Sequence, residues 1–120
     1  MGHQLRKRAT AVVIQDGRVL LVRHRGSHKY SLPGGGVHSS ERSYQAAMRE
    51  LREETGLHPT SAHYIGSYDG ASDHHKAFLI EATGRIRLDR REVGDHVWWD
   101  RHSNLPINGH VHAILRMLGH

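Results

Sequence analysis

Three glutamates, Glu50, Glu53 and Glu54, are the side chains of this sequence whose types and spacing best suit chemistry. On a helix, positions i, i+3 and i+4 are neighbours, so the three carboxylates would share one stripe about 100° wide. Carboxylates this close repel one another unless a positive charge lies between them. Their oxygens are hard ligands that suit Mg²⁺ or Mn²⁺, ions that bind through a few acids, waters and substrate phosphates. The spacing therefore predicts a site for a divalent metal.

The competing interpretation is a solvated acidic helix face, which is the usual state of a Glu-rich helix. Three neighbouring features favour the metal site instead. Arg49 and Arg52 interrupt the acidic run, Gly56 supplies a helix stop, and a triple glycine at 34–36 precedes the helix. A glycine run lets the backbone turn tightly and brings peptide groups close to a bound metal and phosphate.

The elements that must position these residues follow from the hydrophobic pattern. We expect Ser39 or Ser40 to cap the helix and a stripe on it to pack on the core, with members Tyr44, Ala47, Met48 and Leu51. In helical phase Glu41 lies about 180° from Glu50, so it reaches the metal only if the helix has not begun there. We expect Glu41 to cap the helix or to support the site from behind.

The remaining chain predicts a sheet and a closing helix. Strands are expected at 9–14 and 19–22, as a hairpin around Asp16-Gly17, and at 63–68 and 76–82. Residues 84–91 read as a basic turn with a short strand, and 92–99 as an acid pair followed by a strand. Asn108-Gly109 precedes an amphipathic helix with an apolar side made of Val111, Ile114, Leu115 and Leu118.

Composition limits the classes of function. The 120 residues suffice for one domain, 1–120, with a real core, and the absence of cysteine excludes disulfides and thiolate chemistry. The apolar run at 11–14 is too short for a signal sequence or a membrane span, so a cytoplasmic protein is expected. The net charge of +5 suits an anionic partner. Because the basic residues are scattered, a small phosphorylated molecule is favoured over nucleic acid, and the 13 histidines are interpreted as solvated or packed.

The stretch 35–57, GGVHSSERSYQAAMRELREETGL, resembles the signature box of the Nudix (MutT-like) hydrolases. Its matching residues are Gly35, Glu41, Arg49, Glu50, Glu53, Glu54 and Gly56, with Leu51 and Leu57 at the aliphatic positions. The sequence departs from many members at His38 and Ser40, where those have Glu and Gly; this concerns loop geometry and metal affinity more than chemistry. The resemblance implies an α/β fold, a Nudix-type α/β/α sandwich with a mixed sheet, a catalytic loop-helix-loop and a C-terminal helix.

The resemblance also implies roles for the residues of the box. Glu53 and Glu54 would be the main ligands of Mg²⁺, with Mn²⁺ as a substitute, and the Gly34 carbonyl would join them. Glu50 would be a ligand or would activate water, and Arg49 would orient a glutamate.

Outside the box the residue roles are less defined. Arg23 or Arg25 would grip a substrate phosphate, unless they are only a solvated strand end, and Lys76 could do the same. Tyr30 is a candidate to bind substrate by stacking on a base. Glu92, with Asp95 as the second choice, would complete the metal site or act as general base, so the base is left open among Glu50, Glu92 and Asp95.

The expected function is that of a pyrophosphohydrolase acting on a phosphoanhydride bond of a nucleoside diphosphate linked to another moiety. Its partner would be a small nucleotide, with nucleic acid only in the form of capped RNA, and a homodimer is left open. The alternative is a catalytically silent Nudix-like module that senses a nucleotide. Such modules would be expected to lose box carboxylates, and all are present here.

Overall fold

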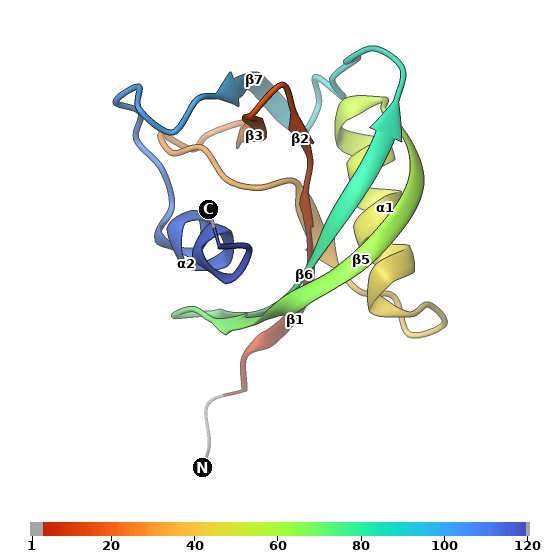
Figure 1. Ribbon diagram of the computed structural model, residues 1–120. Helices are drawn as coiled ribbons and strands as arrows, with labels where there is room; N and C mark the ends of the chain where they lie inside the picture. The colour runs from red at the N-terminus through yellow and green to blue at the C-terminus, as the bar shows by residue number, and fades with distance from the viewer. Residues whose placement is uncertain (1–3, 120) are drawn as a thin grey trace.

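The computed structural model describes residues 4–119, so the ends of the expected domain, residues 1–3 and 120, lie outside it (Figure 1). Its elements in chain order are β1 (Arg6–Val12), β2 (Ile14–Gln15), β3 (Arg18–His24), β4 (Gly34–Gly36), α1 (Ser43–Thr55), β5 (His58–Asp69), β6 (Asp73–Thr83), β7 (Val93–Trp99) and α2 (Gly109–Met117).

Two sheets form the middle layer. The first has the order β4-β1-β6-β5, in which β1 runs antiparallel to β4 and parallel to β6, so this sheet is mixed as expected. The second, β2-β3-β7, is antiparallel throughout. The predicted hairpin around Asp16-Gly17 is present as β2 and β3, whereas the preceding residues leave it and form β1 in the other sheet.

The two helices cover opposite sides of this layer (Figure 1). Alternation along β3 shows the arrangement: buried Leu20 belongs to the apolar cluster of α1, and its neighbour Leu21 to the cluster of α2. Successive strand residues point to opposite faces, so one strand can serve two cores. The tryptophans of β7 divide in the same way, Trp98 toward the α1 side and Trp99 toward the α2 side. The α/β/α sandwich is confirmed.

Helix α1 begins later than the serines suggested. Arg42 is its N-cap residue, and the Gln45 side chain accepts a hydrogen bond of 2.8 Å from the Arg42 N–H, so the prediction of a Ser39 or Ser40 cap was wrong. The helix ends at Gly56, whose φ of 76° lies in the left-handed region that glycine favours. Its buried stripe includes Ala47 and Leu51.

Three further expectations need correction. Tyr44 does not share the buried stripe: it lies in the first turn and is 43% exposed. Residues 84–91 form no strand, because the chain there follows the end of α1, with the Arg87 N–H bonded to the Thr55 carbonyl at 2.6 Å. Strand β5 begins at His58, five residues earlier than the apolar pattern indicated. Within residues 4–119, no helix is both long and apolar enough to cross a membrane.

Candidate active site

Helix α1 and strand β4 together hold the carboxylate site, the name used below for Glu50, Glu53 and Glu54. Glu54 is 2% exposed, and its Oε1 accepts a hydrogen bond of 3.2 Å from the Gly34 N–H of β4. Glu50 is largely covered, with 14% of its side chain exposed, whereas the Glu53 side chain is 51% exposed. The three carboxylates therefore run from the interior to the surface along one side of α1.

Burial dominates the electrostatics of this site. Desolvation, followed by the nearby charge of Glu50, raises the pKa of Glu54 to about 8. The Gly34 hydrogen bond and the charge of Arg8 act in the opposite direction, and Glu92 adds to the rise. A buried carboxylate beside a second one needs a nearby positive charge before it can ionise at neutral pH. The interior end of the carboxylate site is thus built to take up a cation or a proton.

The glycines of β4 leave room for these side chains. A Cβ added to Gly35 would lie 2.5 Å from the Glu50 carboxyl carbon, far inside van der Waals contact. A Cβ on Gly36 would meet nothing within 4 Å. The glycine at position 35 is therefore needed because the Glu50 carboxylate lies directly against the backbone of β4.

Arg49 connects the acids of the site. Its Nη2 and Nε donate to the two oxygens of Glu41, at 2.7 and 3.1 Å, and its Nη1 donates to Glu50 at 2.9 Å and to Glu53 at 3.2 Å. A further hydrogen bond from Nη2, of 3.0 Å, reaches the Gly36 carbonyl. The guanidinium therefore fixes two glutamates of the carboxylate site to the loop that precedes the helix.

Glu41 supports Arg49 from outside the helix. Because α1 starts at Ser43, Glu41 lies before the helix, and its direction is not set by the helical repeat. Its Oε1 also accepts a hydrogen bond of 2.9 Å from the His38 N–H. The Arg49 hydrogen bonds, then the one from His38, lower the pKa of Glu41 to about 2. The bonds to Glu41 and Glu50 correspondingly raise the pKa of Arg49. The geometry agrees with a supporting position for Glu41 behind Arg49.

The two acids of the 92–95 segment have different surroundings. Glu92 is exposed, at the turn before β7, and its charge acts on both Glu54 and His24, so it lies near the carboxylate site. Asp95 lies within β7, where its Oδ2 accepts a hydrogen bond of 2.7 Å from the Tyr30 hydroxyl. That bond comes first in lowering the pKa of Asp95 and in raising that of Tyr30.

The basic residues expected to hold phosphate lie at the end of β3. Arg23 donates from Nη1 to the Ser27 carbonyl at 3.3 Å, and its charge acts on Tyr30 and Asp95. Arg25 donates from Nη1 to the Arg90 carbonyl at 3.2 Å. Their substrate-binding role stays a prediction.

The chemistry of the donor set fits a divalent cation. Glu50, Glu53 and Glu54 offer only hard oxygen ligands, and the raised pKa of Glu54 marks a place where positive charge would be stabilising. In the conformation described for residues 4–119, no three acidic or histidine side chains converge as a metal-binding group. Glu53 instead points to Arg49. Metal binding would therefore require the Glu53 carboxylate to leave Arg49 and turn toward the ion.

A cleft, named the His75 cleft, adjoins the carboxylate site on the α2 side and has a volume of about 430 Å³. Its lining includes Arg8, His24, Tyr68, His75, Asn108 and His110. The rings of His75 and His110 stack with centroids 4.5 Å apart. Arg8 and His24 link this cleft to the carboxylates, because the charge of Arg8 acts on Glu54 and that of Glu50 acts on His24.

Sequence reasoning did not identify the His75 cleft. Its residues come from β1, β3, β5, β6 and the start of α2, so only the folded sheet brings them together. One signal was available: Asn108 and His110 flank the start of the predicted closing helix, a position from which side chains can point back toward the sheet.

Sequence and structure comparisons agree with this fold. The family model described as NUDIX domain matches residues 5–115. The chain is 35% identical over 112 residues to an NAD-capped RNA hydrolase, NudC, of Vibrio atlanticus, an alignment that covers 88% of this chain and 41% of the relative. Over 56 residues it is 43% identical to an RNA pyrophosphohydrolase of Halorhodospira halophila, covering 47% of this chain and 31% of the relative.

Among solved structures, a Nudix hydrolase family member from Chromobacterium violaceum superimposes with a TM-score of 0.84 at 28% identity. This match covers 99% of the present chain and 79% of the other. The mixed sheet between two helices and the family-model match over residues 5–115 define a Nudix-type protein. The chain belongs to the Nudix family. It spans less than half the length of the curated relatives that it matches.

Proposed function

We propose that this protein is a metal-dependent hydrolase that cleaves the pyrophosphate linkage of a nucleoside diphosphate joined to another moiety, with water as the nucleophile. The observation that carries the proposal is the buried Glu54 carboxyl beside Glu50, under the glycines of β4 and with Arg49 at the surface side. The compartment assigned by the proposal is the cytoplasm, where free nucleotides are abundant.

The pyrophosphate bond resists hydrolysis because its negative oxygens repel an incoming nucleophile. Bound at Glu50, Glu53, Glu54 and the Gly34 carbonyl, Mg²⁺ or Mn²⁺ would neutralise phosphate charge and acidify a water. Hydrolysis adds the oxygen of water to one phosphorus, breaks the bridging P–O bond on that side and leaves the bridging oxygen on the other phosphate. A carboxylate must accept the proton of the water.

Glu50 and Glu92 are the carboxylates best placed to accept that proton. Arg49 holds Glu50 at 2.9 Å, which fixes the direction of its carboxylate. Glu92 lies in the turn before β7, close enough for its charge to act on Glu54. Asp95 is already an acceptor for Tyr30. Arg49 positions Glu50 and Glu53. It would become available to a phosphate if Glu53 turned toward a bound metal.

The His75 cleft would take the nucleotide part of the substrate. Arg8 supplies positive charge between the cleft and the carboxylate site, Asn108 offers an amide for a base edge, and Tyr68 offers an aromatic surface. Because relatives are named as hydrolases of NAD-capped RNA and as RNA pyrophosphohydrolases, capped and 5′-triphosphorylated RNA are included among the candidate substrates.

A substrate panel tests the proposal. Nucleoside triphosphates, ADP-ribose, other nucleotide sugars, dinucleoside polyphosphates and capped RNA would be incubated with Mg²⁺, with Mn²⁺ or with chelator. We expect turnover of at least one substrate only with metal, and its loss in the Glu53→Gln, Glu54→Gln double variant. Glu81→Gln, an exposed glutamate of β6, is the matched control and should retain activity.

If no substrate is hydrolysed while one of them binds tightly, the proposal is overturned in favour of a nucleotide-sensing module. The departures at His38 and Ser40 would then be restored to Glu and Gly to ask whether the loop accounts for the loss.

A further inference from the structure

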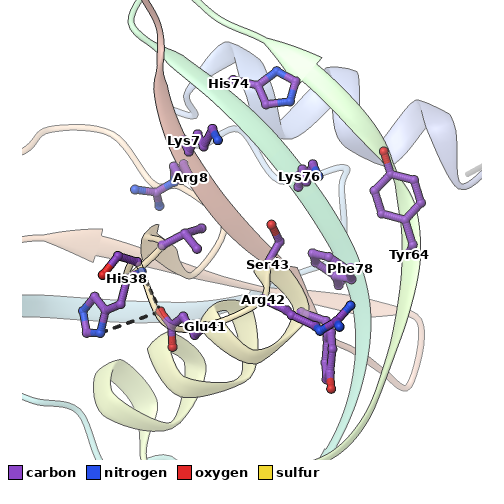
Figure 2. A pocket seen from close by; sticks show the side chains of 13 residues that line it. Lys7, Arg8, His38, Glu41, Arg42, Ser43, Tyr64, His74, Lys76 and Phe78 are labelled. Atoms are coloured by element: carbon purple, nitrogen blue, oxygen red, sulfur yellow. Dashed lines mark hydrogen bonds and ion pairs between the residues drawn. The ribbon is translucent and has the colours of Figure 1, made fainter.

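A further cleft lies on the α1 side of the first sheet, beyond the start of the helix (Figure 2). It has a volume of about 810 Å³, and we name it the Tyr64 groove. Residues central to its lining are Lys7, Arg42, Tyr44, Tyr64, Lys76 and Phe78. None of the three glutamates of the carboxylate site lines it.

Strand register explains why the groove is open. Ala11 and Phe78 are paired across β1 and β6 and are buried in the α1 cluster. Two residues earlier on the same face, Ala9 of β1 is still buried in this cluster, whereas its partner Lys76 on β6 is exposed. The next pair on that face is Lys7 with His74, and Lys7 is also exposed. The sheet face thus changes from apolar to basic where the helix stops covering it.

Positive charge in the groove is not neutralised locally. Among residues 4–119, neither Lys7 nor Lys76 forms an ion pair. The acid in the lining, Glu41, is held by Arg49 at 2.7 Å. His74 is paired with Asp69 at the far end. The groove therefore presents free lysines to an anion.

Aromatic rings stand beside these lysines. Tyr64, on the edge strand β5, is 59% exposed, and its hydroxyl is hydrogen-bonded to the Ser67 hydroxyl at 2.7 Å. Its ring lies 5.6 Å from that of Phe78, measured between centroids. Tyr44 on the first turn of α1 is 43% exposed. A flat group that stacks on an exposed ring removes apolar surface from water, and a nucleobase is such a group.

We propose that the Tyr64 groove binds a short single strand of nucleic acid, with phosphates on Lys7, Lys76 and Arg42 and a base stacked on Tyr64. Unpaired cations along a groove with interleaved aromatic rings are the elements with which proteins hold single strands without reading their sequence. An acidic peptide would use the lysines but leaves the rings without a role. The groove borders the carboxylate site through Arg8 and Glu41. The lysines and the tyrosine on which the inference rests are not part of that site, so the inference does not depend on the proposed hydrolysis.

Fluorescence anisotropy tests the inference on the full chain. A 5′-labelled oligouridine of ten nucleotides is titrated with protein at several KCl concentrations. Chelator is present throughout, so that hydrolysis plays no part. We expect binding that weakens with salt. Replacing both lysines, Lys7→Gln and Lys76→Gln, should reduce the slope of log K against log[KCl] by about 1.4, or about 0.7 per phosphate contact.

The ring contact is tested separately. Tyr64→Ala should weaken binding by about 5-fold or more, and Tyr64→Phe, which keeps the ring, should bind as the parent does. A duplex of the same length should compete poorly because its bases are already stacked. Circular dichroism melting checks that each variant folds.

The matched control is Arg18→Gln with Arg116→Gln, which removes the same charge from exposed residues outside the groove. If both double variants lose affinity equally, the attraction is diffuse and the inference is overturned. It is equally overturned if Tyr64→Ala binds as the parent does, or if the oligonucleotide does not bind at 50 mM KCl.

Discussion

Arg49 is the residue on which the charge balance of the site depends. One guanidinium contacts Glu41, Glu50 and Glu53, whereas Glu54 lies beyond its reach and instead accepts a backbone N–H. The two kinds of partner leave the acids in different states: Glu41 has a pKa lowered to about 2, and Glu54 one raised to about 8. The site is thus divided into an outer part that Arg49 neutralises and an inner part, at Glu54, where the charge of Arg8 does not offset burial and the charge of Glu50.

A first prediction at this scale concerns Glu41. Glu41→Gln keeps the size of the side chain but loses the paired contact with Arg49, so Arg49 no longer holds Glu50 and Glu53 in place. We expect kcat and the apparent Mg²⁺ affinity to fall by about 10-fold with little change in substrate KM. Steady-state kinetics at several Mg²⁺ concentrations measure this, with Glu81→Gln as control. An unchanged Mg²⁺ dependence would show that Glu41 stabilises only the loop before α1 and does not position Glu50 and Glu53 through Arg49.

A second prediction distinguishes the two acids of the 92–95 segment. Glu92→Gln should lower kcat by about 100-fold and remove the acidic limb of the pH–rate profile, as expected for loss of a general base. Asp95→Asn, which alters the contact with Tyr30, should change substrate KM more than kcat. The opposite ranking of the two variants would assign the base to Asp95, and full activity in both would assign it to Glu50.

At the level of elements, β4 and the start of α1 act as one unit. The strand is only three glycines long, but it pairs with β1 on one side and lies against Glu50 and Glu54 on the other. A side chain at position 35 would have to displace the Glu50 carboxylate.

This close approach gives a third prediction. Gly35→Ala places a methyl group 2.5 Å from the Glu50 carboxyl carbon, so Glu50 must move. We expect at least a 10-fold loss of kcat and a weaker response to Mg²⁺. Gly36→Ala, whose added Cβ meets nothing, should keep activity within about 2-fold. Equal activity of the two variants would contradict the placement of Glu50 against β4.

The elements also show what the sequence could and could not predict. The amphipathic pattern correctly located α1 and α2, and the β-branched runs located most strands. Tyr44 was misplaced because periodicity gives the face of a helix and not the point at which the sheet beneath it ends. The alternation at 84–91 suggested a strand, but the backbone there bonds to the end of α1 instead.

At the scale of the whole molecule, the box residues were predictable because they lie within one short segment. The His75 cleft and the Tyr64 groove were not, because each is assembled from separate strands by sheet order. The parallel pairing of β1 with β6 brings Arg8 opposite His75 and Lys7 opposite His74. Basic residues that look scattered along the chain therefore gather on two faces of one sheet.

The stacked histidines give a fourth prediction, about the pH dependence of stability. Burial, followed by the charge of Arg8, lowers the pKa of His75 to about 4, and burial followed by His75 lowers that of His110 to about 3. The unfolded chain binds these protons from near pH 6.5 downward, whereas the folded chain does not. Their contribution to stability is therefore complete above pH 6.5 and is lost as the pH falls toward 4.

Urea unfolding at pH 4.5 and pH 7.0 measures this effect. Beyond the general acid sensitivity of the protein, we expect each histidine of the pair to account for a loss on the order of 2 kcal/mol. In His110→Gln the difference between the two pH values should shrink, while in His63→Gln, an exposed histidine, it should match the parent. A difference unchanged in His110→Gln would show that the stacked pair does not titrate on unfolding.

The measurement that most directly tests the central claim is the hydrolysis rate as a function of Mg²⁺ concentration, with the best substrate of the panel. The parent protein and the Glu53→Gln, Glu54→Gln double variant would be compared in one series. We predict a rate that saturates with Mg²⁺, vanishes in chelator and falls by at least about 100-fold in the double variant. A rate that persists in chelator, or a double variant as active as the parent, would contradict catalysis at the carboxylate site.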